Sequence, residues 1–245
     1  MNDVAESAEH RVFADPNTLA REVAEWLCGL AQAAVGEFAI CLSGGSTPRL
    51  LYERLADPSV ASRFPWQRVH WFWGDERFVP KNDPRSNYRM VYEALLAKAP
   101  IDAARVHAIP TENISPEQSA ADYENVLKRF YGGENLDSRR PIFDVNLLGI
   151  GENGHTASLF PGDPALDEER RWAVAVRDEA AETRITLTYP ALNSSRDAAF
   201  LATGESKRQV VARARAGDRR IPAGRIRPVG RLHWFTDRSA AEGGA

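Results

Sequence analysis

The sequence predicts an α/β fold, in which a mostly parallel sheet carries helices on both faces. Apolar runs short enough to be strands alternate along the chain with amphipathic segments of helical period. Several of these runs are apolar throughout, which is typical of parallel strands covered on both faces. We see no internal repeat and no long linker, so we expect a single domain over residues 1–245, with 1–10 and 240–245 as frayed tails.

Local signals place the individual elements. Asp15 is a natural N-cap for a helix that starts near Pro16, and Ser46 or Thr47 is expected to cap a second helix. This second helix is expected at 46–56, and further helices are expected around 88–96, at 115–131 and at 206–216. Strands are expected at 37–45, 68–80 with its exit loop, 106–109, 143–151, 171–178, 184–192, 197–204 and 232–237.

Bulk composition excludes several classes of protein. The net charge is −3, and the locally basic stretch 213–228 is interrupted by Gly, Pro and Asp, so we interpret it as a solvated loop rather than a nucleic-acid surface. The polar N-terminus is no signal peptide, and no apolar run approaches the roughly 20 residues that span a bilayer. Cys28 and Cys41 lie in apolar surroundings and are expected to be buried thiols. We expect a cytoplasmic protein without a nucleic-acid or membrane partner.

The loops that follow the strands hold the candidate functional residues, because parallel sheets bind ligands at the carboxyl ends of their strands. The first loop reads SGGSTP and contains Ser43, Gly44, Gly45, Ser46 and Thr47. Glycines let backbone N–H groups approach an anion, hydroxyls add donors, and the next helix offers its positive end. This pattern favours phosphate binding, while a plain capped turn is the alternative. The loop lacks the Lys of a nucleotide P-loop.

The second loop, GDERFVP, places Asp75, Glu76 and Arg77 at the end of an aromatic strand. Two adjacent carboxylates are costly to bury unless they are paired, and an arginine suits bidentate contact with phosphate or carboxylate. An exposed turn explains the same residues equally well.

The third loop follows the strand 143–151 and carries His155 after several glycines. A histidine at the end of a strand lies where a general base is needed, and imidazole titrates near neutral pH. A purely structural histidine is the alternative interpretation.

The fourth loop, TGESKRQVV, has Ser206 as a possible helix cap and Lys207 in the first helical turn. The helix dipole disfavours a cation there, and a bound anion at the same helix end would offset that cost. Otherwise Lys207 points into solvent.

Together the loops supply anion donors, two cations, an imidazole and carboxylates. No His, Cys and carboxylate set has metal-ligand spacing, and no Ser or Cys sits in a nucleophile motif. The combination predicts metal-free acid–base chemistry, without a cofactor, on a small phosphorylated molecule.

The G-x-G-x-x-G at 149–154 raises one rival, a dinucleotide site. Such a site needs a helix of several turns after the third glycine, but Pro161, Gly162 and Pro164 stop one after roughly two turns. The glycines are better explained as room for a substrate beside His155.

The motifs resemble those of a known family. LSGGSTPRLLYERLA, WFWGDERFVPKNDPRSNYRMVYEALL, LLGIGENGHTASLFPG, RITLTYPALN and LATGESKRQVV follow the order and spacing of the 6-phosphogluconolactonases, over roughly residues 10 to 240. The resemblance implies a Rossmann-like fold of the sugar-phosphate isomerase type and hydrolysis of 6-phospho-D-glucono-1,5-lactone in the oxidative pentose phosphate pathway.

The resemblance also implies roles for individual residues. His155 is the expected general base, the loop from Ser43 to Thr47 holds the phosphate together with Arg77 and Lys207, and Asp75 contacts sugar hydroxyls or orders the water. Arg184 is a weaker candidate for substrate contact. Backbone N–H groups of the 149–156 loop, or a cation, are the expected oxyanion donors.

The chain departs from its relatives two residues before His155, where many carry an acid and this chain has Asn153. An amide oxygen can fix the imidazole tautomer but cannot stabilise an imidazolium as a carboxylate does. Glu152 or Asp75 is left as the source of a negative charge. A glucosamine-6-phosphate deaminase, which has Ile-Ala-Phe-Asn after the Gly-His step, and a sugar-phosphate sensor are the rival functions.

Overall fold

The computed structural model describes residues 8–178 and 180–241. The strands of the main sheet are β1 (Glu9–Phe13), β2 (Phe38–Leu42), β3 (Val69–Trp73), β5 (Val106–His107), β6 (Phe143–Leu148), β9 (Ser195–Ala202) and β10 (Arg231–Asp237). Their order is β1-β10-β9-β6-β2-β3-β5, and every neighbouring pair is parallel.

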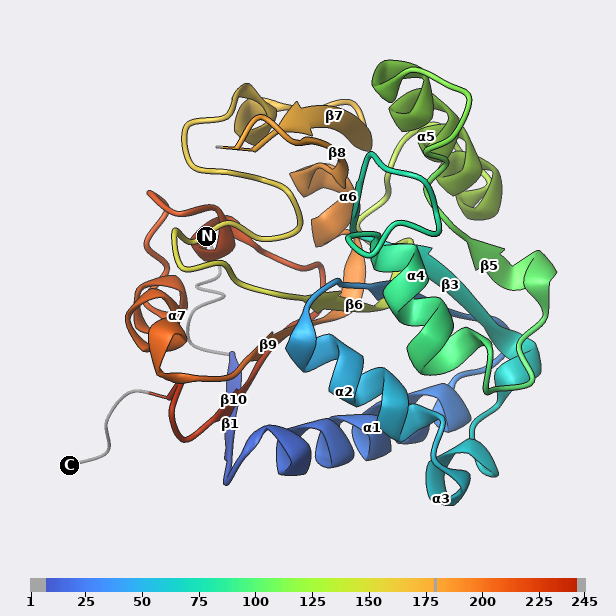
Figure 1. Ribbon diagram of the computed structural model, residues 1–245, viewed down its shortest axis with the longest axis vertical. Coiled ribbons are helices and arrows are strands. Elements are labelled where there is room, and N and C mark those ends of the chain that lie inside the picture. Colours follow the sequence, from blue (N-terminus) through green and yellow to red (C-terminus); the bar gives the residue numbers. More distant parts are fainter. Residues whose placement is uncertain (1–7, 179, 242–245) are drawn as a thin grey trace.

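Helices cover both faces of this sheet. They are α1 (Pro16–Ala33), α2 (Ser46–Leu55), α3 (Pro58–Ala61), α4 (Asn87–Val91), α5 (Pro116–Tyr131), α6 (Tyr189–Asn193) and α7 (Arg208–Arg215). A π-helical segment, Tyr92–Leu96, continues α4, and short 3₁₀ helices span Trp66–Arg68, Ala103–Arg105, Pro164–Asp167, Glu205–Lys207 and Pro222–Arg225. Helices α1, α2 and α3 lie on one side of the sheet and α5 and α6 on the other (Figure 1). The predicted fold class is confirmed.

The predicted side-chain cap is present at α1 and absent at α2. The Asp15 carboxylate accepts a hydrogen bond from the Thr18 N–H at 2.9 Å, as predicted for α1. Helix α2 has Gly45 as its N-cap and no side-chain cap, so the prediction of Ser46 or Thr47 was wrong. The Thr47 hydroxyl instead bonds to Thr203 at 2.7 Å.

The predicted helix 206–216 is also divided. A 3₁₀ turn spans Glu205–Lys207, and α7 begins at Arg208 without a side-chain cap, so Ser206 does not cap it. Lys207 is the N-cap residue of α7 rather than part of its first turn. Arg213, at the start of the predicted solvated loop 213–228, is in α7 and pairs with Asp218 at 2.9 Å.

A second, antiparallel sheet was not predicted. Strands β4 (Asp75–Arg77), β8 (Thr183–Leu187) and β7 (Ala173–Arg177) pair in that order. The expected strand 184–192 ends at Leu187, because Pro190 lies in the first turn of α6, where a proline costs no hydrogen bond. β7 and β8 follow each other along the chain with no helix between them, which favours an antiparallel hairpin over a parallel pair.

The tails are shorter than expected. Glu9 and His10 belong to β1, which pairs with β10, so they are not frayed. At the other end Ala240 and Ala241 are buried. Residues 1–7 and 242–245 lie outside the described part of the chain, so the prediction for them is not addressed.

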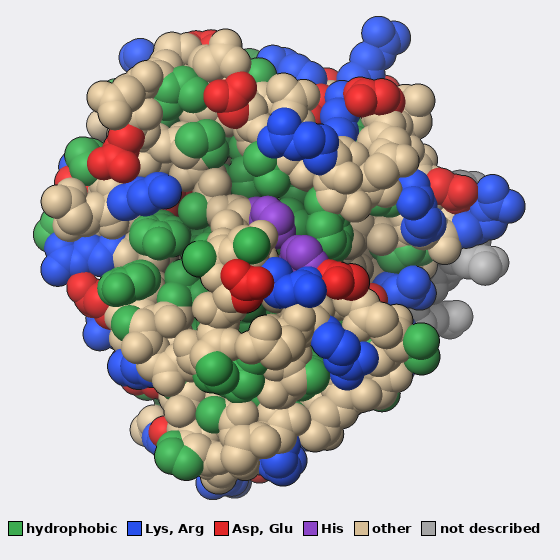
Figure 2. Space-filling model, turned by 90° about the vertical axis from the view of Figure 1, so that its right-hand side faces the viewer, with side chains coloured by type: hydrophobic (Ala, Val, Ile, Leu, Met, Phe, Trp, Pro, Cys, Tyr) green, Lys and Arg blue, Asp and Glu red, His purple; other side chains and the backbone are tan. Residues whose placement is uncertain are grey.

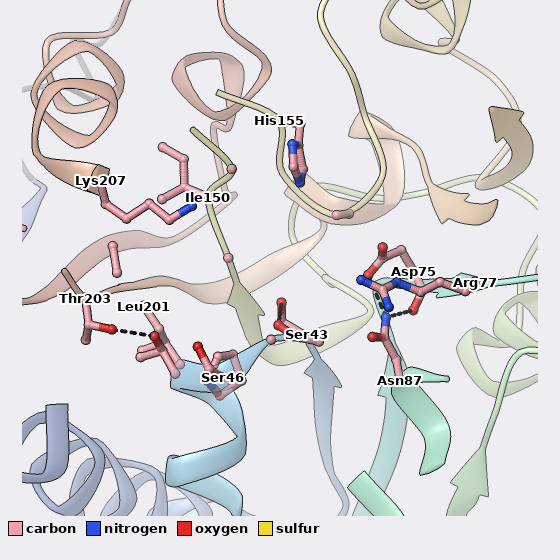
Figure 3. Close-up of a pocket in the computed structure, with 18 of the residues that line it drawn as sticks. Ser43, Ser46, Asp75, Arg77, Asn87, Ile150, His155, Leu201, Thr203 and Lys207 are labelled. Atoms are coloured by element: carbon pink, nitrogen blue, oxygen red, sulfur yellow. Dashed lines mark hydrogen bonds between the residues drawn. The ribbon is translucent and has the colours of Figure 1, made fainter. Parts of the chain in front are cut away.

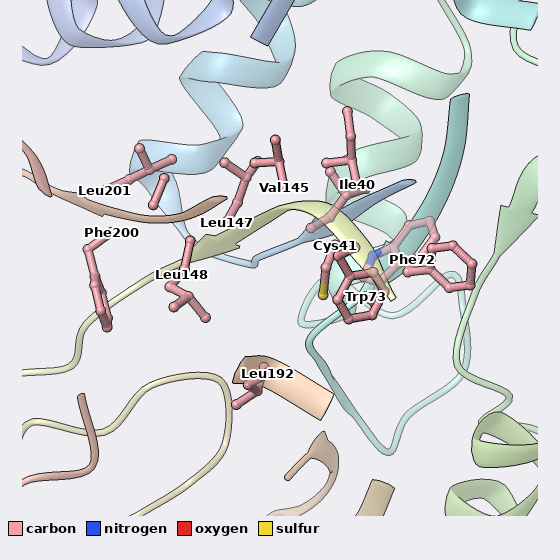
Figure 4. Close-up of a cluster of buried hydrophobic side chains, with 14 of the residues drawn as sticks. Ile40, Cys41, Phe72, Trp73, Val145, Leu147, Leu148, Leu192, Phe200 and Leu201 are labelled. Carbon is pink, nitrogen blue, oxygen red and sulfur yellow. The ribbon is translucent and has the colours of Figure 1, made fainter. Parts of the chain in front are cut away.

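The core fills the space between the main sheet and its helices. Apolar side chains from adjacent strands pack together there, namely Ile40, Cys41, Phe72, Trp73, Val145, Leu147, Leu148, Phe200 and Leu201, with Leu192 of α6 (Figure 4). Cys28 and Cys41 are both buried free thiols, as predicted.

Two buried tyrosines fix the ends of neighbouring strands. The Tyr52 hydroxyl accepts a hydrogen bond from the Ser43 N–H at 3.0 Å and donates one to the Ser43 carbonyl at 2.8 Å. Tyr123 bonds the N–H and carbonyl of Trp73 in the same way, both at 2.8 Å. Buried backbone groups must be paired. These hydroxyls therefore let the chain leave the sheet at two adjacent positions without losing hydrogen bonds.

A histidine pair lies at the opposite, amino-terminal part of the sheet. Figure 2 looks onto the side of the molecule that carries β5, and histidine side chains are visible in the middle of that face. His70 on β3 and His107 on β5 have their nearest ring nitrogens 2.9 Å apart. The His107 ring also stacks on Phe72 with the centroids 4.4 Å apart. Burial, with the nearby His70 and Arg105 charges, lowers the pKa of His107 to about 4.

We expect His107→Gln to flatten the pH dependence of stability on the acid side. The unfolded chain binds a proton at histidine near pH 6.5 and the folded protein only near 4, so the free energy of unfolding falls as the pH drops through this window. Urea denaturation of both proteins at several pH values checks this. Burial raises the pKa of Glu76 to about 7, which acts in the opposite direction, but both proteins keep this group and its effect cancels in the comparison. Equal pH dependence in the two proteins would contradict the prediction.

Candidate active site

The site lies where the order of the sheet reverses. From β2 the chain builds outward through β3 and β5, whereas β6, β9 and β10 follow each other in the other direction. A crevice forms at such a switch point because the loops after the two central strands diverge to opposite faces. Here these are the loops that follow β2 and β6, and they contain the SGGSTP segment and His155.

A pocket of about 270 Å³ occupies this crevice. Ten of the predicted site residues line it, namely Ser43, Gly44, Gly45, Ser46, Thr47, Asp75, Arg77, His155, Arg184 and Lys207. In Figure 3, Lys207 and Thr203 lie at one end, Asp75, Arg77 and Asn87 at the other, Ser43 and Ser46 between them, and His155 across the pocket from the serines. The four loops predicted from the sequence therefore meet at one place.

The loop after β2 places the N-terminus of α2, which has no side-chain cap, at the wall of this pocket. Because α2 has no side-chain cap, the first backbone N–H groups of the helix are left for another partner. Ser43 is held in place through its backbone by Tyr52, and Thr47 is tied to Thr203. The arrangement suits an anion at the helix N-terminus.

The orientation of His155 is fixed by Asn153. The Asn153 Oδ1 lies 3.1 Å from the His155 backbone N–H and 2.7 Å from its Nδ1. Since a backbone N–H can only donate, this atom is the acceptor oxygen, and Nδ1 is therefore the protonated ring nitrogen. Nε2 is left as the basic nitrogen of the imidazole.

Gly151 makes room for the imidazole. A Cβ at this position would lie 2.1 Å from both Cε1 and Nδ1 of His155. We expected the loop glycines to leave room for a substrate. At Gly151 the missing side chain instead leaves room for the His155 ring.

Glu152 is not brought into the pocket. The N–H of Gly154 bonds to the carbonyl of Gly151 at 2.9 Å, and this tight turn leaves the Glu152 side chain exposed to solvent. The partner of His155 in this loop is Asn153. The expected two-turn helix after Gly154 is also absent among the described residues 154–163, where turns and an isolated bridge between Thr156 and Leu159 are found.

Asp75 is buried and joins two other segments. Its Oδ2 accepts a hydrogen bond from the Ser158 hydroxyl at 2.6 Å, and its Oδ1 accepts one from Asn87 Nδ2 at 3.3 Å. Ser158 is itself fixed, because its N–H donates to Thr186 Oγ1 at 3.1 Å. Only 6% of Asp75 is exposed, so these donors replace the water that an ionised carboxylate needs.

Arg77 and Lys207 are the two cations without a carboxylate partner in this part of the described structure. Arg77 Nη1 donates to the Arg85 carbonyl at 2.6 Å, while its buried Nε has no hydrogen-bond partner among the described residues. Both side chains line the pocket. An unpartnered buried donor and uncompensated positive charge favour an anionic or strongly polar ligand.

Arg184 differs from these two. It stands opposite Arg77 in the β4–β8 pair, and its Nη2 lies 2.8 Å from both Asp178 and Glu182. Two carboxylates already compensate its charge, so it is a weaker anion ligand than Arg77. They also relieve the repulsion between the two facing arginines.

Sequence reasoning missed two polar side chains that line the pocket, those of Asn87 and Thr203. Asn87 begins α4 directly after the N-cap Ser86, so it reads as an ordinary start of a helix. Thr203 follows β9, and its position at the carboxyl end of a strand was the available signal. In the part of the chain that the structure describes, no three His, Cys, Asp or Glu side chains are placed to hold a metal ion. No helix there has the length and apolar character needed to cross a bilayer.

Comparison with known proteins identifies the family. The model of the glucosamine-6-phosphate isomerases/6-phosphogluconolactonase family matches residues 14–234. The chain belongs to this family. Among curated members, the 6-phosphogluconolactonase of Synechocystis sp. is 41% identical over 215 residues, which cover 86% of this chain and 87% of the relative. The chloroplastic 6-phosphogluconolactonase 3 of Arabidopsis thaliana is 39% identical over 84% of this chain and 65% of the relative.

Solved structures of family members have the same fold. The 6-phosphogluconolactonase from Trypanosoma brucei superposes with a TM-score of 0.83 at 28% identity and covers 95% of this chain and 97% of its own. The enzyme from Thermotoga maritima gives 0.80 at 27% identity, with 94% and 99% covered. A monomeric glucosamine-6-phosphate deaminase shares the fold alone, at 18% identity and a TM-score of 0.78 over 95% of this chain and 98% of its own.

We expect Gly151→Ala to displace the His155 imidazole while the protein stays folded. The φ of Gly151 lies outside the left-handed region, so alanine is tolerated by the backbone and only the contact with the ring is violated. Long-range ¹H–¹⁵N NMR of the ring should show a single Nδ1–H tautomer in the wild type and a mixture in the variant. Gly29→Ala, in open space on α1, is the matched control. An unchanged tautomer in Gly151→Ala would contradict the assignment.

Proposed function

We propose that this chain is a 6-phosphogluconolactonase, which hydrolyses 6-phospho-D-glucono-1,5-lactone to 6-phosphogluconate in the oxidative pentose phosphate pathway. The observation that carries the proposal is the placement of His155, with Nε2 as its basic nitrogen, in a pocket that also contains Arg77 and Lys207. The names of the relatives, at up to 41% identity among those described above, support the same activity. The two buried free thiols support a reducing compartment such as the cytoplasm.

In the proposed mechanism, His155 Nε2 accepts a proton from water as the water oxygen attacks the lactone carbonyl carbon. A tetrahedral oxyanion forms, the bond from this carbon to the ring oxygen then breaks, and the leaving oxygen takes up the proton. Asn153 holds the ring in the tautomer that this step needs. A lactone is a reactive ester, so one oriented base and electrostatic stabilisation are sufficient.

The phosphate is placed at the N-terminus of α2. The loop from Ser43 to Thr47 offers backbone and hydroxyl donors there, and Lys207 lies at the same end of the pocket (Figure 3). Binding energy from the phosphate, remote from the reacting carbon, then positions the lactone against His155.

The oxyanion is assigned to Arg77 rather than to the His155 loop. In that loop the N–H of Gly151 already donates to the His155 carbonyl, that of Gly154 to the Gly151 carbonyl and that of His155 to Asn153. Arg77 lies at the end of the pocket opposite Lys207, and its Nε has no partner among the described residues (Figure 3). Arg77 was expected to hold the phosphate, and the position opposite Lys207 favours the carbonyl end instead. Asp75, beside it, is placed to orient a sugar hydroxyl.

His155→Ala should lower the catalysed rate of lactone opening by about 10²- to 10⁴-fold, because a positioned general base contributes this much. The assay follows acid release from the phosphorylated lactone at neutral pH, with the spontaneous rate subtracted and unphosphorylated gluconolactone as a comparison. Near-normal turnover in the variant would overturn the role of His155. Ammonia release from glucosamine 6-phosphate, without lactone opening, would overturn the proposed function.

Asn153→Asp should move the acid limb of the pH–rate profile to higher pH, by about one unit or more. The new carboxylate would stabilise the protonated imidazole, so the base would become free only at higher pH. Asn153→Ala is the matched control. It removes the tautomer-fixing acceptor and should lower kcat without this upward move. Identical limbs in wild type and Asn153→Asp would show that this position does not control the base.

A further inference from the structure

Asn87 lies between two of the segments that line the pocket, and its backbone is held independently of its side chain. Its N–H donates to Glu76 Oε1 at 2.7 Å, and the neighbouring N-cap Ser86 donates from its hydroxyl to Glu76 Oε2 at 3.1 Å. The side chain is therefore free of any structural duty toward α4. Only 5% of Asn87 is exposed, although the residue lines the pocket.

The amide of Asn87 contacts Asp75 on one side. Its Nδ2 donates to the Asp75 carbonyl at 3.0 Å and to the Asp75 carboxylate at 3.3 Å. Figure 3 shows this pair at the same end of the pocket as Arg77. The Asn87 amide is thus hydrogen-bonded to the segment that carries Arg77, the proposed oxyanion donor.

On its other side, the Asn87 amide lies against Gly44 of the phosphate loop. A Cβ on Gly44 would be 2.1 Å from Asn87 Oδ1 and 2.6 Å from its Cγ. The φ of Gly44 is outside the left-handed region, so the backbone does not require a glycine here. A side chain at this position would instead collide with the asparagine amide and displace it.

We propose that Asn87 is a positioning residue that sets the spacing between the phosphate loop, at Gly44, and the β4 segment, at Asp75. The inference rests on the proposed function, in which a phosphorylated lactone reaches from one segment to the other. A change in this spacing moves the carbonyl carbon relative to His155 while the phosphate remains bound. Displacements of about 1 Å are enough to cost on the order of 10²-fold in rate.

The first test compares a ligand that spans the pocket with one that does not. In Asn87→Ala, we expect the Kd of 6-phosphogluconate to rise about tenfold and kcat to fall about tenfold to a hundredfold. Inorganic phosphate contacts only the phosphate loop, so its Kd should stay within about twofold. A general loosening of the fold would weaken both ligands equally and would overturn the proposal, as would no change in either. Asn17→Ala, in the exposed first turn of α1, is the matched control.

The second test is a double-mutant cycle between Gly44→Ala and Asn87→Ala. Alone, Gly44→Ala should push the asparagine amide off Asp75 and lower kcat about as much as Asn87→Ala does. With alanine at both positions the clash is gone, so the double variant should match Asn87→Ala within about twofold. Effects that multiply instead would show that the two residues act independently and would overturn the proposal. Gly29→Ala serves as the control for adding a methyl group.

The cycle also separates this inference from the proposed function. The clash between the methyl group added by Gly44→Ala and the Asn87 amide exists whatever the substrate is, so thermal denaturation of the four proteins should show the same non-additivity. If the wild type fails to open the lactone but the stability cycle is non-additive, the proposed function fails and the contact stands. If the wild type is active and the cycle is additive in both stability and kcat, the positioning role fails alone.

Discussion

The hydrogen bond between the Ser158 hydroxyl and the Asp75 carboxylate, 2.6 Å long, is the contact on which the site depends. It joins the loop after β6, which carries His155, to the segment after β3, which carries Arg77. Both partners are buried, and an unpaired carboxylate at this depth would cost several kcal/mol. Breaking this hydrogen bond would leave the buried carboxylate unpaired, so it fixes the two loops relative to each other. His155 and Arg77, the proposed base and oxyanion donor, therefore keep their relative positions.

The main sheet supplies the second constraint. Leu42 and Trp73 are partners in the β2–β3 register, so the residues that follow them leave the sheet side by side. The Tyr52 and Tyr123 hydroxyls satisfy the backbone of Ser43 and Trp73 at these exits, and the Gly74 N–H donates to the Leu42 carbonyl at 2.9 Å. These hydrogen bonds fix the positions at which the two chain segments leave the sheet and enter the pocket.

The carboxyl ends of β2 and β6 could be located from sequence, whereas contacts between loops could not. The apolar runs that end at Leu42 and Leu148 fixed where the SGGSTP loop and His155 must lie, because parallel strands share one carboxyl edge. Asn87 and Ser158 carried no such signal, since in the sequence one is an ordinary first residue of a helix and the other a polar residue in a loop, and their partners lie in other loops. The antiparallel sheet was not predicted for the same reason, because β4 has only three residues and its partner β8 follows more than a hundred positions later.

The G-x-G-x-x-G segment matches the dinucleotide-binding motif in sequence, but its glycines have a different structural role here. In a dinucleotide site they bring backbone N–H groups to a pyrophosphate. Here the His155 imidazole occupies the place where a side chain on Gly151 would lie. Gly154 adopts a φ of +88°, and a Cβ on it would lie only 2.6 Å from the Ile221 side chain. The N–H groups of both glycines are spent on carbonyls within the loop. Because these two N–H groups are already paired, the uncapped N-terminus of α2 is the better place for the proposed phosphate, and in this proposal the glycine-rich loop holds His155.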